Sequence, residues 1–151
     1  MKNLNSLSRK LKELNQLENI NSGGCAIVAY ALSKYLINTE TEIIYLLTKE
    51  DLDNDLISKI KEGKTSNCHH SVLKIEDRYI DTEGITSKYK IFNRNSCFPD
   101  EIVASISVPL DLVLKSINEE YWSNEFSRKD NLLKIDNILN LNGLLIRNIE
   151  V

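Results

Sequence analysis

The sequence has little glycine and proline, with 5 Gly and 2 Pro among 151 residues, which excludes a collagen-like chain or a flexible linker. It also lacks a large excess of charge of one sign, because the formal net charge is only −3. A dedicated nucleic-acid-binding protein usually carries a basic excess, so we expect no nucleic-acid partner. With 42% hydrophobic residues, the chain has enough apolar side chains for one folded domain with a sizeable core.

Long apolar runs are missing as well. The N-terminal segment MKNLNSLSRKLKELNQLEN contains no apolar stretch of roughly 7 to 15 residues, which a secretory signal requires. No segment approaches the roughly 20 apolar residues of a membrane span, so we expect a cytoplasmic protein without membrane contact. The N-terminal segment instead predicts an amphipathic helix, because leucines recur every three or four residues, at Leu4, Leu7, Leu11, Leu14 and Leu17.

Cysteine and histidine are scarce too, with 3 Cys and 2 His. An odd number of cysteines cannot pair completely, so at least one thiol is free or belongs to a site, as in a reducing compartment. A metal site built from Cys68, from His69 or His70, and from Cys97 is one hypothesis. These residues lack the regular spacing of zinc ligands, so we expect neither a metal nor a cofactor.

Hydrophobic periodicity predicts a single α+β domain over residues 1–151. Asp51 is a plausible N-cap for one of its helices, and Gly63 follows the end of that helix. Residues 85–151 are assigned only in outline, to completion of the sheet and to C-terminal helices. The expected elements are an N-terminal helix within 1–18, a buried helix over 25–37, a strand over 42–48, a helix over 51–61, strands over 70–75 and 78–82 joined as a hairpin, a strand over 101–108, a helix over 109–126 and helical segments within 129–148.

Cys25 stands at the start of the predicted buried helix, directly after Gly23 and Gly24. The two glycines allow a tight turn and leave no side chain to block approach to the thiol. Unpaired N–H groups and the positive end of the helix dipole favour the nucleophilic thiolate, and the same N–H groups stabilise an oxyanion. Cys25 is therefore the candidate nucleophile, although a small residue packed at a helix start would give the same pattern.

The two histidines are adjacent at the start of a predicted strand, in the segment HHSVLKI. A thiolate nucleophile needs a base within hydrogen-bond reach, and a third group usually orients that base. A two-residue hairpin turn pairs Leu73 with Ile80, which places His70 and Asp81 on one face as diagonal neighbours. His70 is therefore the favoured base and Asp81 the orienting group. His69 is the alternative base, because a one-residue change in the turn exchanges the two faces.

The order of three segments, NSGGCAIVAYALSKYL, HHSVLKI and RYIDTEGI, resembles the papain-like cysteine peptidase superfamily in its small bacterial and phage Cys-His-Asp form. The resemblance implies a central helix that carries the cysteine and packs on a small antiparallel sheet, with additional C-terminal helices. It implies Cys25 as the nucleophile, His70 as the general base and acid, and Asp81 as the orienting carboxylate. It also implies an amide donor in the oxyanion hole, with Asn19 at the expected spacing and Asn21 as the closer alternative.

The resemblance covers residues 19–84, with Ala26 in place of the usual aromatic residue after the nucleophile. It implies a thiol hydrolase that acts on a peptide, isopeptide or amide bond of a protein or peptide substrate. Glutamine deamidation and acyl transfer use the same three groups. The alternative is a non-catalytic protein with a papain-like fold, which serves as a binding or structural module.

Overall fold

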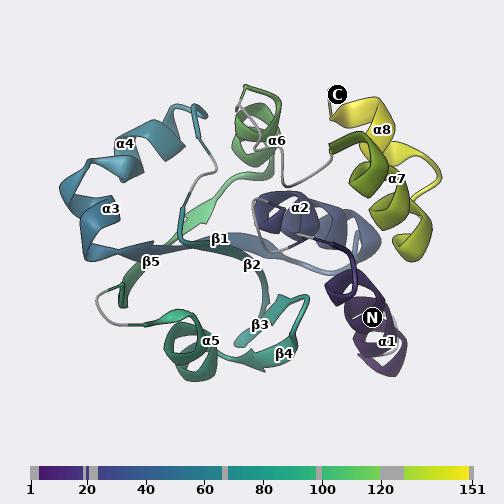
Figure 1. Cartoon of the computed structure of the whole chain (residues 1–151), viewed down its shortest axis with the longest axis horizontal. Coiled ribbons are helices and arrows are strands. Elements are labelled where there is room, and N and C mark those ends of the chain that lie inside the picture. The colour runs from purple at the N-terminus through teal and green to yellow at the C-terminus, as the bar shows by residue number, and fades with distance from the viewer. Residues whose placement is uncertain are drawn as a thin grey trace.

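The computed structural model describes residues 4–18, 20, 24–65, 68–97, 100–119 and 128–149. The fold is α+β, as expected, and is built on a five-stranded antiparallel sheet with the strand order β4-β3-β2-β1-β5 (Figure 1). The strands are β1 (Glu42–Thr48), β2 (His70–Ile75), β3 (Arg78–Asp81), β4 (Gly84–Ser87) and β5 (Ile102–Val108).

The described part of the chain forms eight helices around this sheet. They are α1 (Leu4–Asn15), α2 (Cys25–Tyr35), α3 (Lys49–Asp53), α4 (Leu56–Lys61), α5 (Lys88–Asn95), α6 (Leu110–Glu119), α7 (Arg128–Leu139) and α8 (Leu144–Asn148). Helix α2 lies on one face of the sheet and α5 on the other (Figure 1). The sheet therefore separates two unequal layers of helices.

Helix α2 is the centre of the larger layer because its sequence is apolar on every side, which is typical of a buried helix. Its buried residues run without a break from Ala26 to Ser33 and include Tyr35. Leucines of α1 and apolar residues of α6, α7 and α8 join the same core, among them Leu7, Leu11, Leu14, Val113, Ile117, Leu132, Ile135 and Leu145. The position of Cys25 at the start of α2 is thus fixed by extensive packing.

The hairpin between β2 and β3 has the predicted register, with Leu73 opposite Ile80 and Ile75 opposite Arg78. Leu73 and Ile80 belong to the core on the α2 side. The strand residues that point to the opposite face form a second core between the sheet and α5, together with Ile91 of α5. This core contains Ile44, Leu46, Val72, Tyr79, Ile91 and Ile102. This alternation is the period of two expected for strands covered on both faces.

The predicted helix over residues 51–61 is wrong in two respects. The segment forms two helices, α3 and α4, because Asp55 adopts a left-handed conformation with φ of 55° between them. The N-cap is Thr48 rather than Asp51, and the two side chains form a reciprocal capping box in which Asp51 accepts the N–H of Thr48 at 2.9 Å. Gly63 does follow the end of α4, with φ of 68°.

The C-terminal half was predicted less completely. Strand β5 lies within the expected range 101–108, while β4 and α5 occupy a region where no element was assigned. Helix α6 begins directly after Pro109, as expected, and its predicted continuation through 120–126 lies outside the described residues. The helical pattern over 129–148 corresponds to α7 and α8, which the left-handed residues Asn140, Asn142 and Gly143 separate.

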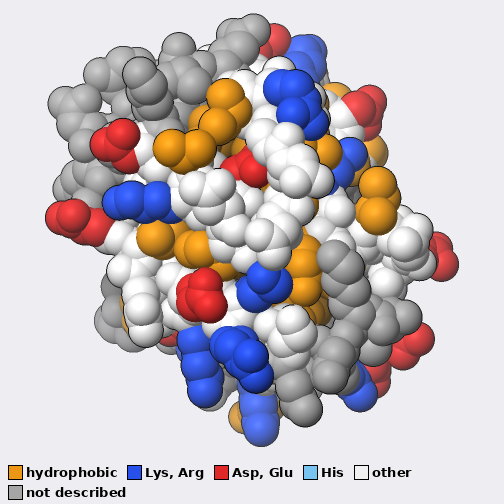
Figure 2. Space-filling model, turned by 90° about the vertical axis from the view of Figure 1, so that its right-hand side faces the viewer, with side chains coloured by type: hydrophobic (Ala, Val, Ile, Leu, Met, Phe, Trp, Pro, Cys, Tyr) orange, Lys and Arg blue, Asp and Glu red, His pale blue; other side chains and the backbone are white. Residues whose placement is uncertain are grey.

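The outer surface near the N-terminus and the C-terminal helices carries charges of both signs. Figure 2 shows hydrophobic side chains there in small separate groups, with acidic and basic side chains on the same face. Within the described ranges, every helix is too short or too polar to cross a membrane.

Candidate active site

Cys25 is the first residue of α2, and Gly24 is the N-cap. Gly24 has a φ of −92°, which any residue adopts, so the expected tight turn does not use the conformational freedom of glycine at this position. Gly23 lies outside the described residues. The first helical hydrogen bond runs from Val28 N–H to the carbonyl of Gly24, and N–H groups earlier in the first turn have no carbonyl acceptor within the helix. The half-buried thiol of Cys25 therefore lies at the N-terminal end of α2, which is the positive end of the helix dipole.

His70 connects the cysteine to a carboxylate. It is the first residue of β2, and Asp81 is the last residue of β3. His70 Nδ1 lies 3.2 Å from Cys25 Sγ, and His70 Nε2 lies 2.9 Å from Asp81 Oδ2. The structure therefore brings together the three residues that the sequence singled out.

His69 occupies a different environment. It is exposed, and its Nε2 lies 2.8 Å from the carbonyl oxygen of Asn95, at the end of α5. Along β2, His70 shares the face of Val72, and the observed hairpin register places that face beside Asp81, as predicted. It is therefore His70 that lies between Asp81 and Cys25.

Asp81 is buried and bound on both carboxylate oxygens. Oδ1 accepts the N–H of Glu83 at 2.9 Å, within the tight turn that joins β3 to β4. Gly84 closes this turn with φ of 135°, a conformation that other residues rarely adopt. Oδ2 accepts a hydrogen bond from Arg94 Nη2 at 2.6 Å, in addition to its contact with His70.

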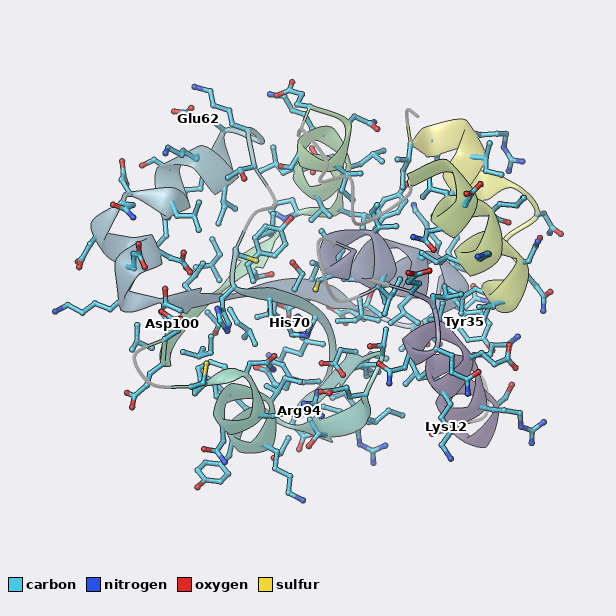
Figure 3. The ribbon with its side chains drawn as sticks, in the orientation of Figure 1. Lys12, Tyr35, Glu62, His70, Arg94 and Asp100 are labelled. Carbon is cyan, nitrogen blue, oxygen red and sulfur yellow. The ribbon has the colours of Figure 1, made fainter. Side chains whose placement is uncertain are left out.

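Arg94 was not identified from the sequence. It lies on α5 and also pairs with Glu83, with Nε 2.6 Å from Glu83 Oε2. In Figure 3, His70 and Arg94 lie on the same side of the sheet, with Arg94 next to α5. A sequence signal for α5 does exist, because Ser87 is its N-cap and accepts the N–H of Lys90, but α5 has only Ile91 as a fully buried residue among those described.

The charges of the site reinforce one another. Burial by itself lowers the pKa of His70, but hydrogen bonds to Asp81 and Cys25 outweigh burial and raise this pKa from 6.5 to about 9. Burial would raise the pKa of Asp81, yet the hydrogen bond and charge of His70, with the charge of Arg94, hold it below the ordinary 3.8. At neutral pH, a protonated His70 therefore lies between an ionised carboxylate and the Cys25 sulfur.

The other two thiols have different surroundings. The Cys68 thiol donates to the carbonyl oxygen of His70 at 3.1 Å, and burial raises its pKa to about 12. Cys97 is exposed beyond the end of α5. Across the described ranges, no three His, Cys, Asp or Glu side chains gather as metal ligands, so the hypothesis of a Cys68, His69 or His70, and Cys97 site gains no support.

Asn19 and Asn21, the expected oxyanion-hole donors, lie outside the described residues. A cavity of about 540 Å³ lies between α1 and β4 and is lined by Ser8, Asp77, Arg78, Ile85, Thr86 and Ser87. The lining of this cavity contains none of Cys25, His70 and Asp81.

In comparisons with known proteins, no protein-family profile, no curated protein and no solved structure matches the chain.

Proposed function

We propose that the protein is a cysteine hydrolase with a papain-like core that cleaves a peptide, isopeptide or amide bond through a Cys25 thioester. The observation that carries the proposal is the continuous contact from Cys25 Sγ to His70 and from His70 to Asp81, at 3.2 Å and 2.9 Å. Nucleophile, base and orienting group within hydrogen-bond reach are the signature of an activated nucleophile. The antiparallel sheet with the cysteine at the start of a central helix agrees with the papain-like arrangement.

In the proposed first half-reaction, the Cys25 thiolate, paired with protonated His70, attacks the substrate carbonyl carbon. The carbonyl electrons move to oxygen, and N–H groups at the start of α2 stabilise the resulting oxyanion. When the oxyanion collapses, the C–N bond breaks and the leaving nitrogen takes the proton from His70 Nδ1. The products of this step are a free amine and an acyl group on Cys25.

In the second half-reaction, neutral His70 accepts a proton from water while the water oxygen attacks the thioester. The C–S bond then breaks, which releases the carboxylic acid and restores the thiolate beside protonated His70. Asp81 stabilises the imidazolium and fixes the ring so that Nδ1 faces Cys25. A glutamine side chain as substrate would give deamidation, and an amine in place of water would give acyl transfer.

The first experiment compares the three thiols of the full chain with iodoacetamide at neutral pH, followed by peptide mapping. We expect alkylation of Cys25 ahead of Cys97, although Cys97 is the exposed thiol, and slow alkylation of the half-buried Cys68, whose raised pKa keeps it protonated. Preferential alkylation of Cys97 would contradict an activated Cys25.

The second experiment measures turnover of quenched-fluorescent peptides, ε-acyl-lysine peptides and glutamine peptides, with ammonia detection for the last. We expect turnover by the wild type and none by Cys25→Ala, with Cys97→Ala as the matched control. Turnover that persists in Cys25→Ala would refute the proposal. A reactive Cys25 with no turnover of any of the three substrate kinds would favour the binding or structural module.

A further inference from the structure

Arg94 shares a single carboxylate oxygen with His70. Its Nη2 lies 2.6 Å from Asp81 Oδ2, the same atom that His70 Nε2 contacts at 2.9 Å. We propose that Arg94 is a positioning residue for the proposed triad, which holds Asp81 against His70 and limits how tightly Asp81 retains the proton on His70. This inference rests on the proposed function.

The geometric part of the argument concerns the orientation of the carboxylate. The N–H of Glu83 holds Oδ1, and Arg94 holds Oδ2, so the plane of the Asp81 carboxylate is fixed from two sides. Without Arg94, the only hydrogen bonds recorded for Asp81 in the described residues are those with His70 and with Glu83 N–H. Because Asp81 orients the His70 ring, α5 also helps to hold this ring, through Arg94 and Asp81.

The anchoring of α5 shows why Arg94 keeps this position. Ile91, one turn earlier, is buried in the core beneath the sheet. The Asn95 side chain donates to the carbonyl of Ile91 at 2.8 Å, and the carbonyl of Asn95 contacts His69. The last turn of α5 is therefore tied to His69, the residue before β2, and through Arg94 to Asp81 of β3.

The electrostatic part concerns the charged and titratable groups that contact or surround His70 among the described residues. Cys25 faces the ring from α2, and Asp81 faces it from β3. Cys68 contacts its backbone, and Asp51 of α3 acts on Cys68. Arg94 and its partner Glu83 follow beyond Asp81 on the α5 side.

Among these groups, Arg94 is the cation that opposes protonation of His70. Opposite charges favour the charged form of a neighbour and like charges disfavour it. Arg94 draws on the same oxygen that stabilises the imidazolium, so its removal should strengthen the hold of Asp81 on the proton. Glu83 neutralises part of this effect, although its side chain is about half exposed and solvent screens its charge.

This balance matters for the proposed reaction because His70 must give its proton to the leaving amine. A proton that is held too tightly transfers slowly, since an effective catalytic acid has a pKa near the working pH. Arg94 thus acts on the reaction through Asp81 and His70, without contact to the reacting atoms.

The test compares Arg94→Gln, Arg94→Lys and the control Lys90→Gln, which removes an exposed charge from the same helix. The His70 ring is titrated by NMR in the full chain, and kcat and KM are measured on the best substrate of the panel. For Arg94→Gln, we expect the titration midpoint to rise by about 0.5 to 1 pH unit. We also expect kcat to fall roughly 10-fold with KM unchanged. Arg94→Lys should restore the midpoint, and Lys90→Gln should resemble the wild type.

A second variant is expected to shift the His70 titration midpoint in the opposite direction. Glu83→Gln leaves the charge of Arg94 less neutralised, so the His70 midpoint should move downward. Glu83 is exposed, and circular dichroism checks that the variant is folded. An unchanged or lower midpoint in Arg94→Gln, or an unchanged or higher one in Glu83→Gln, would overturn the inference. The proposed function fails on different results, namely a wild type that shows no turnover and no preferential alkylation of Cys25. In that case the NMR midpoints still decide whether Arg94 acts on His70.

Discussion

Helices α2 and α5 approach the Cys25–His70–Asp81 cluster from opposite faces of the sheet, and they differ in almost every physical respect. Helix α2 is apolar and almost wholly buried, and it supplies the candidate nucleophile. Helix α5 is polar and mostly exposed, with Ile91 buried, and it supplies the cation that binds Asp81. The candidate nucleophile is therefore carried by the more deeply buried helix and the cation beside Asp81 by the more exposed one.

The two thiols near these helices give the largest expected contrast. Cys25→Ala should lower kcat by about 10⁴-fold or more, because no other group replaces the nucleophile. Cys97→Ala, beyond the end of α5, should leave kcat within about twofold, as expected for an exposed residue. Steady-state kinetics on one substrate, with thermal melts of both variants, checks this. Comparable losses in the two variants would remove the distinction between the faces.

The two adjacent histidines test the same contrast at one strand. His70→Gln should lower kcat by about 10²- to 10⁴-fold, because the proton donor and acceptor is lost. His69, which contacts α5 through the carbonyl of Asn95, should tolerate the same substitution with less than about a threefold change. Kinetics of both variants at several pH values provides the measurement. If His69→Gln is the more damaging change, the assignment of the base is wrong.

Buried isoleucines compare the stability of the two faces. Ile27 of α2 and Ile91 of α5 are both fully buried, but Ile27 belongs to the larger core. We expect Ile27→Ala to cost about 4 to 5 kcal/mol of the free energy of unfolding and Ile91→Ala about 2 to 3 kcal/mol. Urea denaturation gives both values, and hydrogen exchange should show faster local opening of α5 in Ile91→Ala. Equal costs would mean that the smaller core is as tightly packed as the larger one.

The pH dependence of stability tests the link between the faces. The pKa of His70 is raised to about 9 from 6.5, so its stabilising contribution is complete below pH 6.5 and is lost as the pH rises through 9. This contribution is roughly 3 kcal/mol. The lowered pKa of Asp81 acts in the other direction, with stability present above pH 3.8 and lost on further acidification.

The measurement is a series of urea denaturations across this pH range for the wild type and His70→Gln. The alkaline decrease should be present in the wild type and largely absent from the variant. A wild-type free energy of unfolding that stays constant from pH 6.5 to 9 would show that the folded state gains nothing from protonation of His70.

The sequence predicted the elements whose cause is local. A long apolar run defined α2, a short apolar run defined β1, and a two-residue turn set the register that places His70 near Asp81. The break between α3 and α4 was missed because it depends on the left-handed conformation of Asp55 and on the capping box at Thr48.

Arg94 shows the limit of such reasoning most clearly. Its helix buries Ile91 and leaves most of its length exposed, so the periodic signal is weak. Its role depends on a contact with Asp81, 13 residues earlier, that exists only once α5 has packed beneath the sheet. An arginine in a polar segment has no local signature of that kind, whereas Cys25 and His70 are marked by the helix and strand that they begin.

The hydrogen bond from Cys68 to the His70 carbonyl has a practical consequence. Because the pKa of this thiol is raised to about 12, its S–H bond persists while His70 titrates. The S–H stretching vibration absorbs in a clear part of the protein infrared spectrum, and its frequency depends on the strength of the hydrogen bond. In a Cys25→Ala, Cys97→Ala double variant, Cys68 would be the single remaining thiol. It is then a label-free vibrational reporter attached to the backbone of the histidine.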